Sequence, residues 1–285
     1  MLASVTGQAA QKARNRENKQ QRKQQVRSGA VPSSRYGTLA GIEDLLGAFH
    51  PPTGPFDPEG SWKQAYQMHL RNDAQESAPG FLEIRREVSG AGLTLFVEMQ
   101  VLHMTGGLQQ TTAKITCASD PLSSPKSWQL ESVLADPTGR PLESTRMTGR
   151  ATVKAGAVEA EFGKHKRTIK LPGPFTSNWP LFDAVQHLRG KDTAPLRFAL
   201  LEDLDLLKPN HRLSFAETAT VKVAGGSELK LTGYEQIGEG VLPFHYWLDE
   251  QGRLLFVLSG PRAYIYDPEA RIKVTDAKQR GRRKA

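Results

Sequence analysis

Hydrophobic and polar residues alternate along much of the chain from Trp62 onward. In the clearest stretch, every second position is apolar, and the polar residues Thr94, Glu98 and Gln100 lie between these positions; the apolar positions are Leu93, Leu95, Val97, Met99 and Val101. A period of two places one face of a strand against a core and the other face in water, as in antiparallel sheets. The chain from Trp62 onward is therefore predicted to be rich in β-strands.

Further strands are predicted at similar spacing, and most are separated by turns that contain Gly or Pro. Between Trp247 and Leu254, the sequence Asp249-Glu250-Gln251-Gly252 predicts a tight hairpin turn. No internal repeat recurs at a fixed period, so the pattern does not favour a propeller or a solenoid. The predicted strands cover residues 62–70, 81–87, 93–101, 109–118, 127–135, 142–149, 151–161, 164–171, 195–201, 212–223, 228–237, 242–249, 253–259 and 262–266.

One helix is predicted to interrupt the strands, at residues 178–189. Ser177 or Asn178 can cap it, and Pro180 suits its first turn. A twisted open sheet rarely exceeds about ten strands. We therefore expect a mainly β fold, a curved antiparallel sheet or incomplete barrel, with this helix packed on the concave side or plugging one end. The helical stripe consists of Trp179, Leu181, Phe182, Val185 and Leu188.

Positive charge is concentrated at the two ends of the chain. Residues 1–35 contain eight Lys/Arg and one acidic residue, and residues 271–285 contain seven and one. The remaining 23 basic and 28 acidic residues leave the middle net negative, so a basic groove in the folded domain is not indicated. We predict disordered basic tails at 1–35 and 271–285, a Pro/Gly-rich linker with a short helical island at 36–61, and a single β-rich domain at 62–270.

No familiar catalytic, cofactor-binding or metal-binding motif is present. The single cysteine, Cys117, excludes an intramolecular disulfide and a zinc site built from several cysteines, and its strand pattern favours a buried thiol. The acidic run 202–205 lacks the spacing of a calcium loop and is interpreted as a solvated loop or helix start. Asp183 and His187 are interpreted as a surface pair. An enzyme is not predicted, although catalytic groups that are distant in sequence leave that alternative open.

Aromatic residues near the predicted helix and the last strands are candidates for lining an apolar pocket. The alternative is that the same side chains form the core and its rim, and the presence of a cavity decides between the two. The candidates are Trp179, Phe182, Phe244, Tyr246, Trp247, Phe256 and Tyr264.

The final hairpin, residues 241–255, resembles a group of bacterial envelope proteins of unknown function that have a curved β-sheet. The broader architecture distantly resembles the periplasmic lipoprotein carriers. This resemblance implies a periplasmic or secreted protein. The weakly apolar residues 1–10 fit either a truncated signal peptide or an ordinary terminus, and a cytoplasmic location stays open.

The function expected from these observations is a non-catalytic binding or structural role in the envelope or outside the cell. One alternative is a carrier of lipid or of a lipidated protein, and another is binding of nucleic acid or an anionic surface through the basic tails. The expected partner is a hydrophobic ligand or another envelope protein. No cofactor is expected, and no stretch approaches the roughly 18 apolar residues that span a bilayer.

Overall fold

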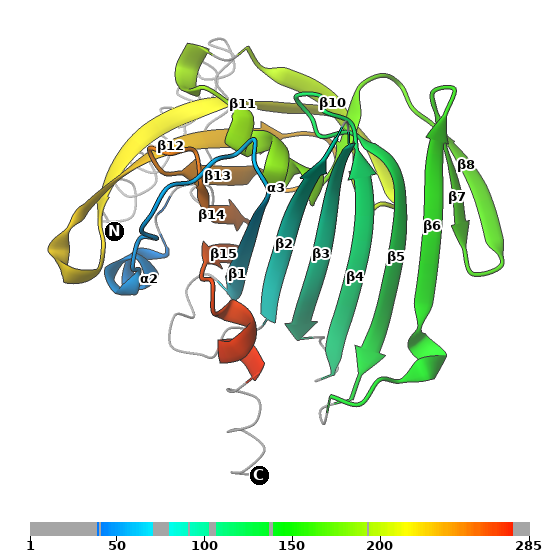
Figure 1. Cartoon of the computed structure of the whole chain (residues 1–285), viewed down its shortest axis with the longest axis horizontal. Helices are drawn as coiled ribbons and strands as arrows, with labels where there is room; N and C mark the ends of the chain where they lie inside the picture. The colour runs from blue at the N-terminus through cyan, green and yellow to red at the C-terminus, as the bar shows by residue number, and fades with distance from the viewer. Residues whose placement is uncertain are drawn as a thin grey trace, which may run out of the picture. The chain divides into compact units, whose positions relative to one another are not determined.

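The structure is a computed structural model that describes residues 39, 41–70, 80–90, 92–102, 107–136, 139–192 and 194–275 (Figure 1). All of them belong to one compact unit, residues 36–285. The predicted tail at 1–35, and residues 276–285 of the other one, lie outside the described residues.

The strands form a single 15-stranded sheet. Its two halves meet in the middle, where the first strand of the chain lies beside the last one. β1 (Trp62–Leu70) pairs with β15 (Arg262–Tyr266). Beyond β1 follow β2 (Gly80–Ser89), β3 (Gly92–Leu102), β4 (Leu108–Cys117), β5 (Pro125–Ala135), β6 (Met147–Lys154), β7 (Ala157–Phe162) and β8 (His165–Lys170). Beyond β15 follow β14 (Leu254–Ser259), β13 (Phe244–Leu248), β12 (Glu228–Ile237), β11 (Leu206–Lys222), β10 (Leu196–Glu202) and β9 (Phe175–Ser177).

The sheet is open among the described strands, because β8 and β9 are its two ends and are not paired with each other. Every neighbouring pair is antiparallel except β9 and β10. The sheet is curved, so that β10–β13 pass behind β2–β5 in Figure 1. This arrangement confirms the predicted fold class of a curved, mainly antiparallel sheet.

The inner face of the sheet holds the main core, because apolar side chains from both halves meet there. Leu95 and Ile115 of the first half belong to the same buried cluster as Tyr246 and Leu254 of the second half. The helix α3 (Pro180–Ala184) lies in this cluster and continues as a 3-10 helix, Val185–His187. The predicted helix at 178–189 is thus present but shorter, and all residues of α3 are buried.

The outer face of β12–β15 carries a second buried cluster, which the N-terminal helix α2 (Glu43–Ala48) covers. Leu46 and Phe49 pack there, and the Phe49 ring lies 4.7 Å from the ring of Phe256. The predicted helical island is therefore present. Because both faces of β14 are covered, all six of its residues are buried, and its apolar sequence shows no alternation.

Some predicted strand boundaries are wrong. The residues 142–149 do not form one strand, because Glu143–Thr145 is a 3-10 turn and β6 begins at Met147. The predicted strand 151–161 is divided by a turn in which Ala155 and Gly156 have positive φ angles of 47° and 74°. The three-residue β9 was not predicted, since so short a strand shows no period.

Residues 270–275 form helical turns that pack on the sheet. Ala270 and Val274 are buried together with Ala65 and Phe81, on the outer face of β1 and β2. The first residues of the predicted basic tail at 271–285 therefore belong to the folded unit.

The contact between α2 and the sheet predicts a stability effect. Phe49→Ala should lower the free energy of unfolding by about 3 kcal/mol, because it removes a buried ring and leaves a cavity against Phe256. Urea unfolding followed by tryptophan fluorescence measures this change. Asp44→Ala on the exposed side of α2 is the control and should stay within about 0.5 kcal/mol of wild type. Equal midpoints for the two variants would contradict the packing of α2.

Candidate functional site

A cavity of about 400 Å³ lies on the inner face, between the two halves of the sheet and α3. Its apolar wall consists of aliphatic, methionine and aromatic side chains, and polar residues complete the lining. The apolar residues are Met68, Leu82, Met99, Val101, Leu130, Met147, Trp179, Phe182, Leu200, Phe244, Tyr246 and Tyr264. The polar residues are Gln109, Thr111, Ser132, Asn178, Glu202, Asp203, Asp205, Gln236 and Arg262.

The structure brings together five of the seven aromatic residues that were candidates for a pocket. They are Trp179, Phe182, Phe244, Tyr246 and Tyr264. Phe182 is central, because its ring lies 5.8 Å from the ring of Tyr264 and 6.3 Å from that of Tyr246. Helix α3 therefore contributes to the cavity wall directly.

The prediction was wrong for Trp247 and Phe256. They are direct partners across β13 and β14, and both belong to the outer cluster that α2 covers. Successive residues of a strand point to opposite faces, so Tyr246 and Trp247 cannot both line one inner cavity. This alternation was visible in β13 and could have separated Trp247 from Phe244 and Tyr246, whereas the uniformly buried β14 gives no such signal for Phe256.

The sequence prediction missed the methionines of the cavity. Met68, Met99 and Met147 are the three methionines in the described part of the chain, and all of them line it. They come from β1, β3 and β6. A methionine side chain is unbranched and adapts to irregular shapes, which suits the wall of an irregular cavity.

Polar side chains gather where β10 turns into β11. This turn is the acidic run 202–205, where Asp203 and Asp205 are exposed in a tight turn between strands; of the two predicted alternatives, the helix start was wrong. Glu202 forms an ion pair of 2.5 Å with Lys208, and Asp205 forms one with Arg167. Asp203 accepts a hydrogen bond of 2.8 Å from the amide of Asn178.

Arg262 is the one basic side chain among the described residues that line the cavity; it is exposed and forms a side-chain hydrogen bond with the phenol of Tyr264. Burial raises the pKa of Asp203, while the Asn178 hydrogen bond and the charge of Arg262 act in the opposite direction. Burial also raises the pKa of Tyr246 and Tyr264, so both phenols are neutral near pH 7. The carboxylates of the lining therefore have partners, and the guanidinium of Arg262 lies close to Asp203 and Tyr264.

A buried polar network fixes α3 against the sheet. Asp183 is fully buried, and its Oδ1 lies 2.7 Å from Nε of Arg86 on β2. The Ser123 hydroxyl donates to its other oxygen at 2.5 Å, and His187 Nε2 lies 3.3 Å from Oδ1. The interpretation of Asp183 and His187 as a surface pair was wrong, because Asp183 is the anchor of the helix.

Cys117 lies next to this network and is buried. Burial, followed by the charge of Asp183, raises the pKa of the Cys117 thiol. A thiol with a raised pKa is a poor nucleophile near neutral pH. This agrees with the sequence-based expectation of a structural thiol.

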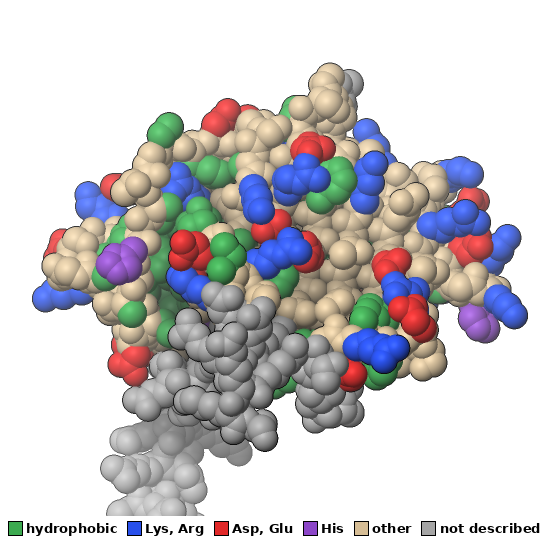
Figure 2. Space-filling model, turned by 60° about the horizontal axis from the view of Figure 1, so that its bottom comes forward, with side chains coloured by type: hydrophobic (Ala, Val, Ile, Leu, Met, Phe, Trp, Pro, Cys, Tyr) green, Lys and Arg blue, Asp and Glu red, His purple; other side chains and the backbone are tan. Residues whose placement is uncertain are grey.

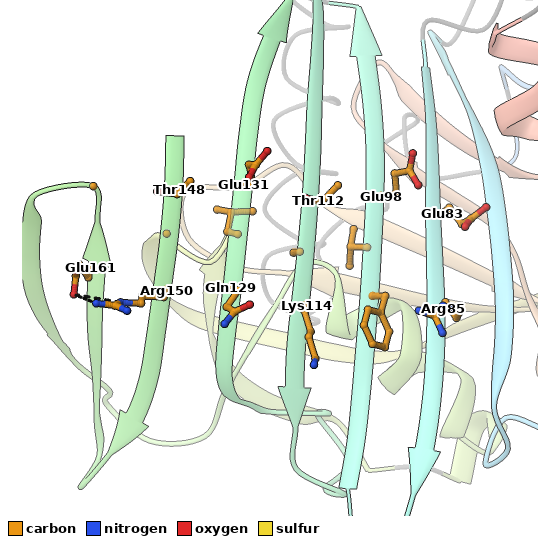
Figure 3. Close-up of a pocket in the computed structure, with 16 residues that line it drawn as sticks. Glu83, Arg85, Glu98, Thr112, Lys114, Gln129, Glu131, Thr148, Arg150 and Glu161 are labelled. Atoms are coloured by element: carbon orange, nitrogen blue, oxygen red, sulfur yellow. Dashed lines mark hydrogen bonds and ion pairs between the residues drawn. The ribbon is translucent and has the colours of Figure 1, made fainter. Parts of the chain in front are cut away.

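A second hollow, of about 910 Å³, lies on the outer face of β2–β7 (Figure 3). Figure 3 shows charged side chains projecting from successive strands, with Arg150 joined to Glu161. Most of its charges are already paired: Glu83 with Lys63, Glu98 with Arg271, and Glu131 with Arg146. This is the pattern of a solvated sheet face, so the inner cavity is the better candidate site.

Within the described ranges, no group of three or more His, Cys, Asp or Glu side chains is placed to hold a metal ion. Among the same residues, no helix has the length and apolar character needed to cross a membrane.

No family model and no curated protein matches this chain. Among solved structures, it is similar to the crystal structure of a beta-barrel-like protein of the domain of unknown function DUF1849 from Brucella abortus. The two chains are 10% identical with a TM-score of 0.48, and the match covers 73% of this chain and 95% of that one. That protein, like the group expected from the sequence, is a β-rich domain of unknown function.

The α3 network predicts a pH-dependent stability. Burial alone lowers the pKa of His187, but the hydrogen bonds and charges of Asp183 and Glu59 outweigh it, and the net pKa lies above the ordinary 6.5. The protonated form is therefore favoured in the folded state. The contribution of protonated His187 to the free energy of unfolding is complete below pH 6.5. It is lost as the pH rises through the higher pKa that His187 has in the folded state.

The free energy of unfolding of wild type and His187→Gln should thus differ most on the acid side of pH 6.5 and converge at higher pH. Denaturant titrations at several pH values measure the difference. Glu59→Gln removes one of the two carboxylates near His187 and should give a smaller change of the same sign. A difference that grows with increasing pH would contradict this assignment.

Proposed function

We propose that this protein is a non-catalytic binding protein whose inner cavity holds the apolar chain of an amphiphile. The observation that carries the proposal is the convergence of methionine and aromatic side chains from both halves of the sheet and from α3 on one cavity. Its volume of about 400 Å³ falls within the range of roughly 300–1,000 Å³ that small-molecule sites occupy.

The distribution of polar groups supports an amphiphile rather than a purely apolar ligand. Gln109, Thr111 and Ser132 lie close together on β4 and β5, and the Ser132 hydroxyl oxygen lies 3.0 Å from that of Thr111. Asn178, Asp203 and Arg262 form another polar region. A ligand with a polar head and an apolar chain satisfies both kinds of surface.

The charge of the lining supports an anionic head group. Glu202 and Asp205 are paired with their own cations, whereas the exposed Arg262, a hydrogen-bond partner of the Tyr264 phenol, has no ion pair with another described residue. A planar guanidinium binds a carboxylate with two parallel hydrogen bonds, which makes this side chain a suitable partner for a fatty acid head. The proposed ligand is therefore a single-chain carboxylic acid.

The sequence resemblance to bacterial envelope proteins supports a location in the cell envelope for this activity. A protein that encloses an apolar chain between a sheet and a helix can shield that chain from water. In the cell envelope, such a protein would act as a carrier of lipid, which is one of the alternatives considered from the sequence.

Filling the cavity should abolish binding. Thr111→Phe places a ring into the lining from β4, whereas Thr112→Phe points to the exposed outer face of the same strand and serves as the matched control. Titration with a fluorescent fatty acid should show at least a tenfold weaker Kd for the first variant, because the chain loses its space.

Met147→Trp at the partly exposed end of the cavity provides a second blocking variant that avoids overpacking the core. It should weaken binding in the same direction. Wild-type affinity in both blocking variants, or the absence of fatty acid binding by wild type, would contradict the proposed function.

Replacement of Arg262 in the cavity lining should change head-group selectivity. Arg262→Gln should weaken binding of a fatty acid about tenfold, the loss expected for a charge-assisted hydrogen bond. The fatty alcohol with the same chain should bind both proteins equally. Arg197→Gln, an exposed arginine on β10 that is absent from the lining, is the control. Equal losses for acid and alcohol would show that Arg262 does not select the head group.

A further inference from the structure

His211 of β11 is a buried histidine that lies behind the cavity wall and is not part of the lining. Its ring stacks on Phe198 of β10, with 5.7 Å between the two ring centres. The ring also occupies the space beside Gly238, where a Cβ atom would lie 2.2 Å from the Nδ1 atom of His211. The position of the imidazole is therefore fixed by β10 and by the chain that follows β12.

Two hydrogen bonds connect this imidazole with the cavity. The hydroxyl of Tyr246 on β13 donates to Oε1 of Gln236 on β12 at 2.7 Å. The Nε2 atom of Gln236 lies 3.2 Å from Nδ1 of His211. Tyr246 and Gln236 both line the cavity, so the chain of contacts ends at the ligand site. We call Tyr246, Gln236 and His211 the relay.

The direction of both hydrogen bonds follows from the chemistry of the three groups. Burial raises the pKa of Tyr246, so the phenol keeps its proton and can donate it. An amide nitrogen has hydrogens to donate and cannot accept, so Gln236 donates to His211. The Nδ1 atom of His211 must then accept, which requires a neutral ring with its proton on Nε2.

A second proton on His211 is incompatible with this arrangement. It would place an N–H group on Nδ1, opposite the N–H groups of the Gln236 amide. Rotation of the amide relieves this conflict, because it presents the amide oxygen to His211 and the amide nitrogen to Tyr246. The hydroxyl of Tyr246 must then accept, and its own hydrogen turns toward the cavity. An O–H group without an acceptor disfavours an apolar occupant, which displaces the water that this group would bind.

The groups around His211 determine when it gains this proton. Burial is the largest influence and lowers the pKa of His211 below the ordinary 6.5. The backbone and the carboxylate of Glu239 and the carboxylate of Glu202 act in the opposite direction, whereas Lys208 acts with burial. These residues come from β10, from β11 and from the chain after β12, which are packed around the ring. His211 is therefore neutral at pH 7 and becomes protonated only below pH 6.5.

We propose that the relay makes the cavity sensitive to pH, because protonation of His211 turns the Gln236 amide and the Tyr246 hydroxyl and so weakens binding of an apolar chain. The effect on the ligand rests on the proposed function, whereas the coupling between His211 and Tyr246 does not. Because coupling between two binding events is reciprocal, a bound apolar chain also lowers the affinity of His211 for its proton.

The test uses a fluorescent fatty alcohol, because its head group does not titrate. Its Kd is measured from above pH 6.5 down to the lowest pH at which circular dichroism shows an intact fold. Wild type should bind at least about tenfold more weakly at the acid end. His211→Asn retains an acceptor near the position of Nδ1 but cannot gain a proton, so its Kd should not change with pH. Tyr246→Phe has no hydroxyl to turn, so its Kd should also be independent of pH, although His211 still titrates.

Other histidines provide the controls. Figure 2 shows histidine side chains at the surface of the molecule, and His165 of β8 is exposed. His165→Gln should show the same dependence of Kd on pH as wild type. His187→Gln should do so as well, although His187 belongs to the network that anchors α3. The carboxylates of the cavity lining are retained in every variant, so a pH effect that they cause would persist in His211→Asn.

Several outcomes would overturn the proposal. Wild-type binding that does not change with pH would do so, as would a pH dependence that persists in His211→Asn. Loss of the pH dependence in His187→Gln alone would assign proton sensing to the α3 network. A pH dependence that persists in Tyr246→Phe would show that protonation of His211 acts through the stability of the fold rather than through the relay.

An NMR titration of His211 without ligand separates this proposal from the proposed function. Tyr246→Phe removes the group that opposes rotation of the Gln236 amide, so the pKa of His211 should lie above that of wild type. A raised pKa without any binding of the alcohol by wild type would support the relay and reject the cavity ligand. Binding of the alcohol with an unchanged pKa would reject the relay and keep the cavity ligand.

Discussion

The pairing of β1 with β15 holds the two halves of the sheet together. Residues 66–70 pair in antiparallel register with residues 262–266, about 200 positions later in the chain. Each half alone would expose the apolar face that the other half covers, and neither would enclose a cavity. A contact between such distant segments carries a large loop-closure cost, so it depends on burial of the inner face for its stability.

Helix α3 prevents the inner face from closing into a solid core. The Asp183 carboxylate is buried with Arg86, Ser123 and His187, and removal of one partner from such a network leaves an uncompensated buried charge. The helix is therefore held at a defined position, with Phe182 in the wall of the cavity.

The sequence was sufficient for the fold class, for most strands, for the helix near Pro180 and for five of the 21 residues that line the cavity. Period-two alternation predicts a strand wherever one face of the strand is exposed to solvent and the other is buried. It fails at β14, whose two faces are both buried, and at β9, which has only three residues. The anchoring role of Asp183 was not predictable, because its partners come from β2 and from the loop after β4, distant in sequence.

The cavity methionines link this protein to the oxidant level of its surroundings. Oxidation of a thioether to the sulfoxide converts an apolar, flexible side chain into a polar and chiral one. At Met68, Met99 or Met147 this change would place a strong hydrogen-bond acceptor in the cavity wall. Under the proposed function, oxidation of these thioethers would weaken binding of the apolar chain, and enzymatic reduction of the sulfoxides would restore it.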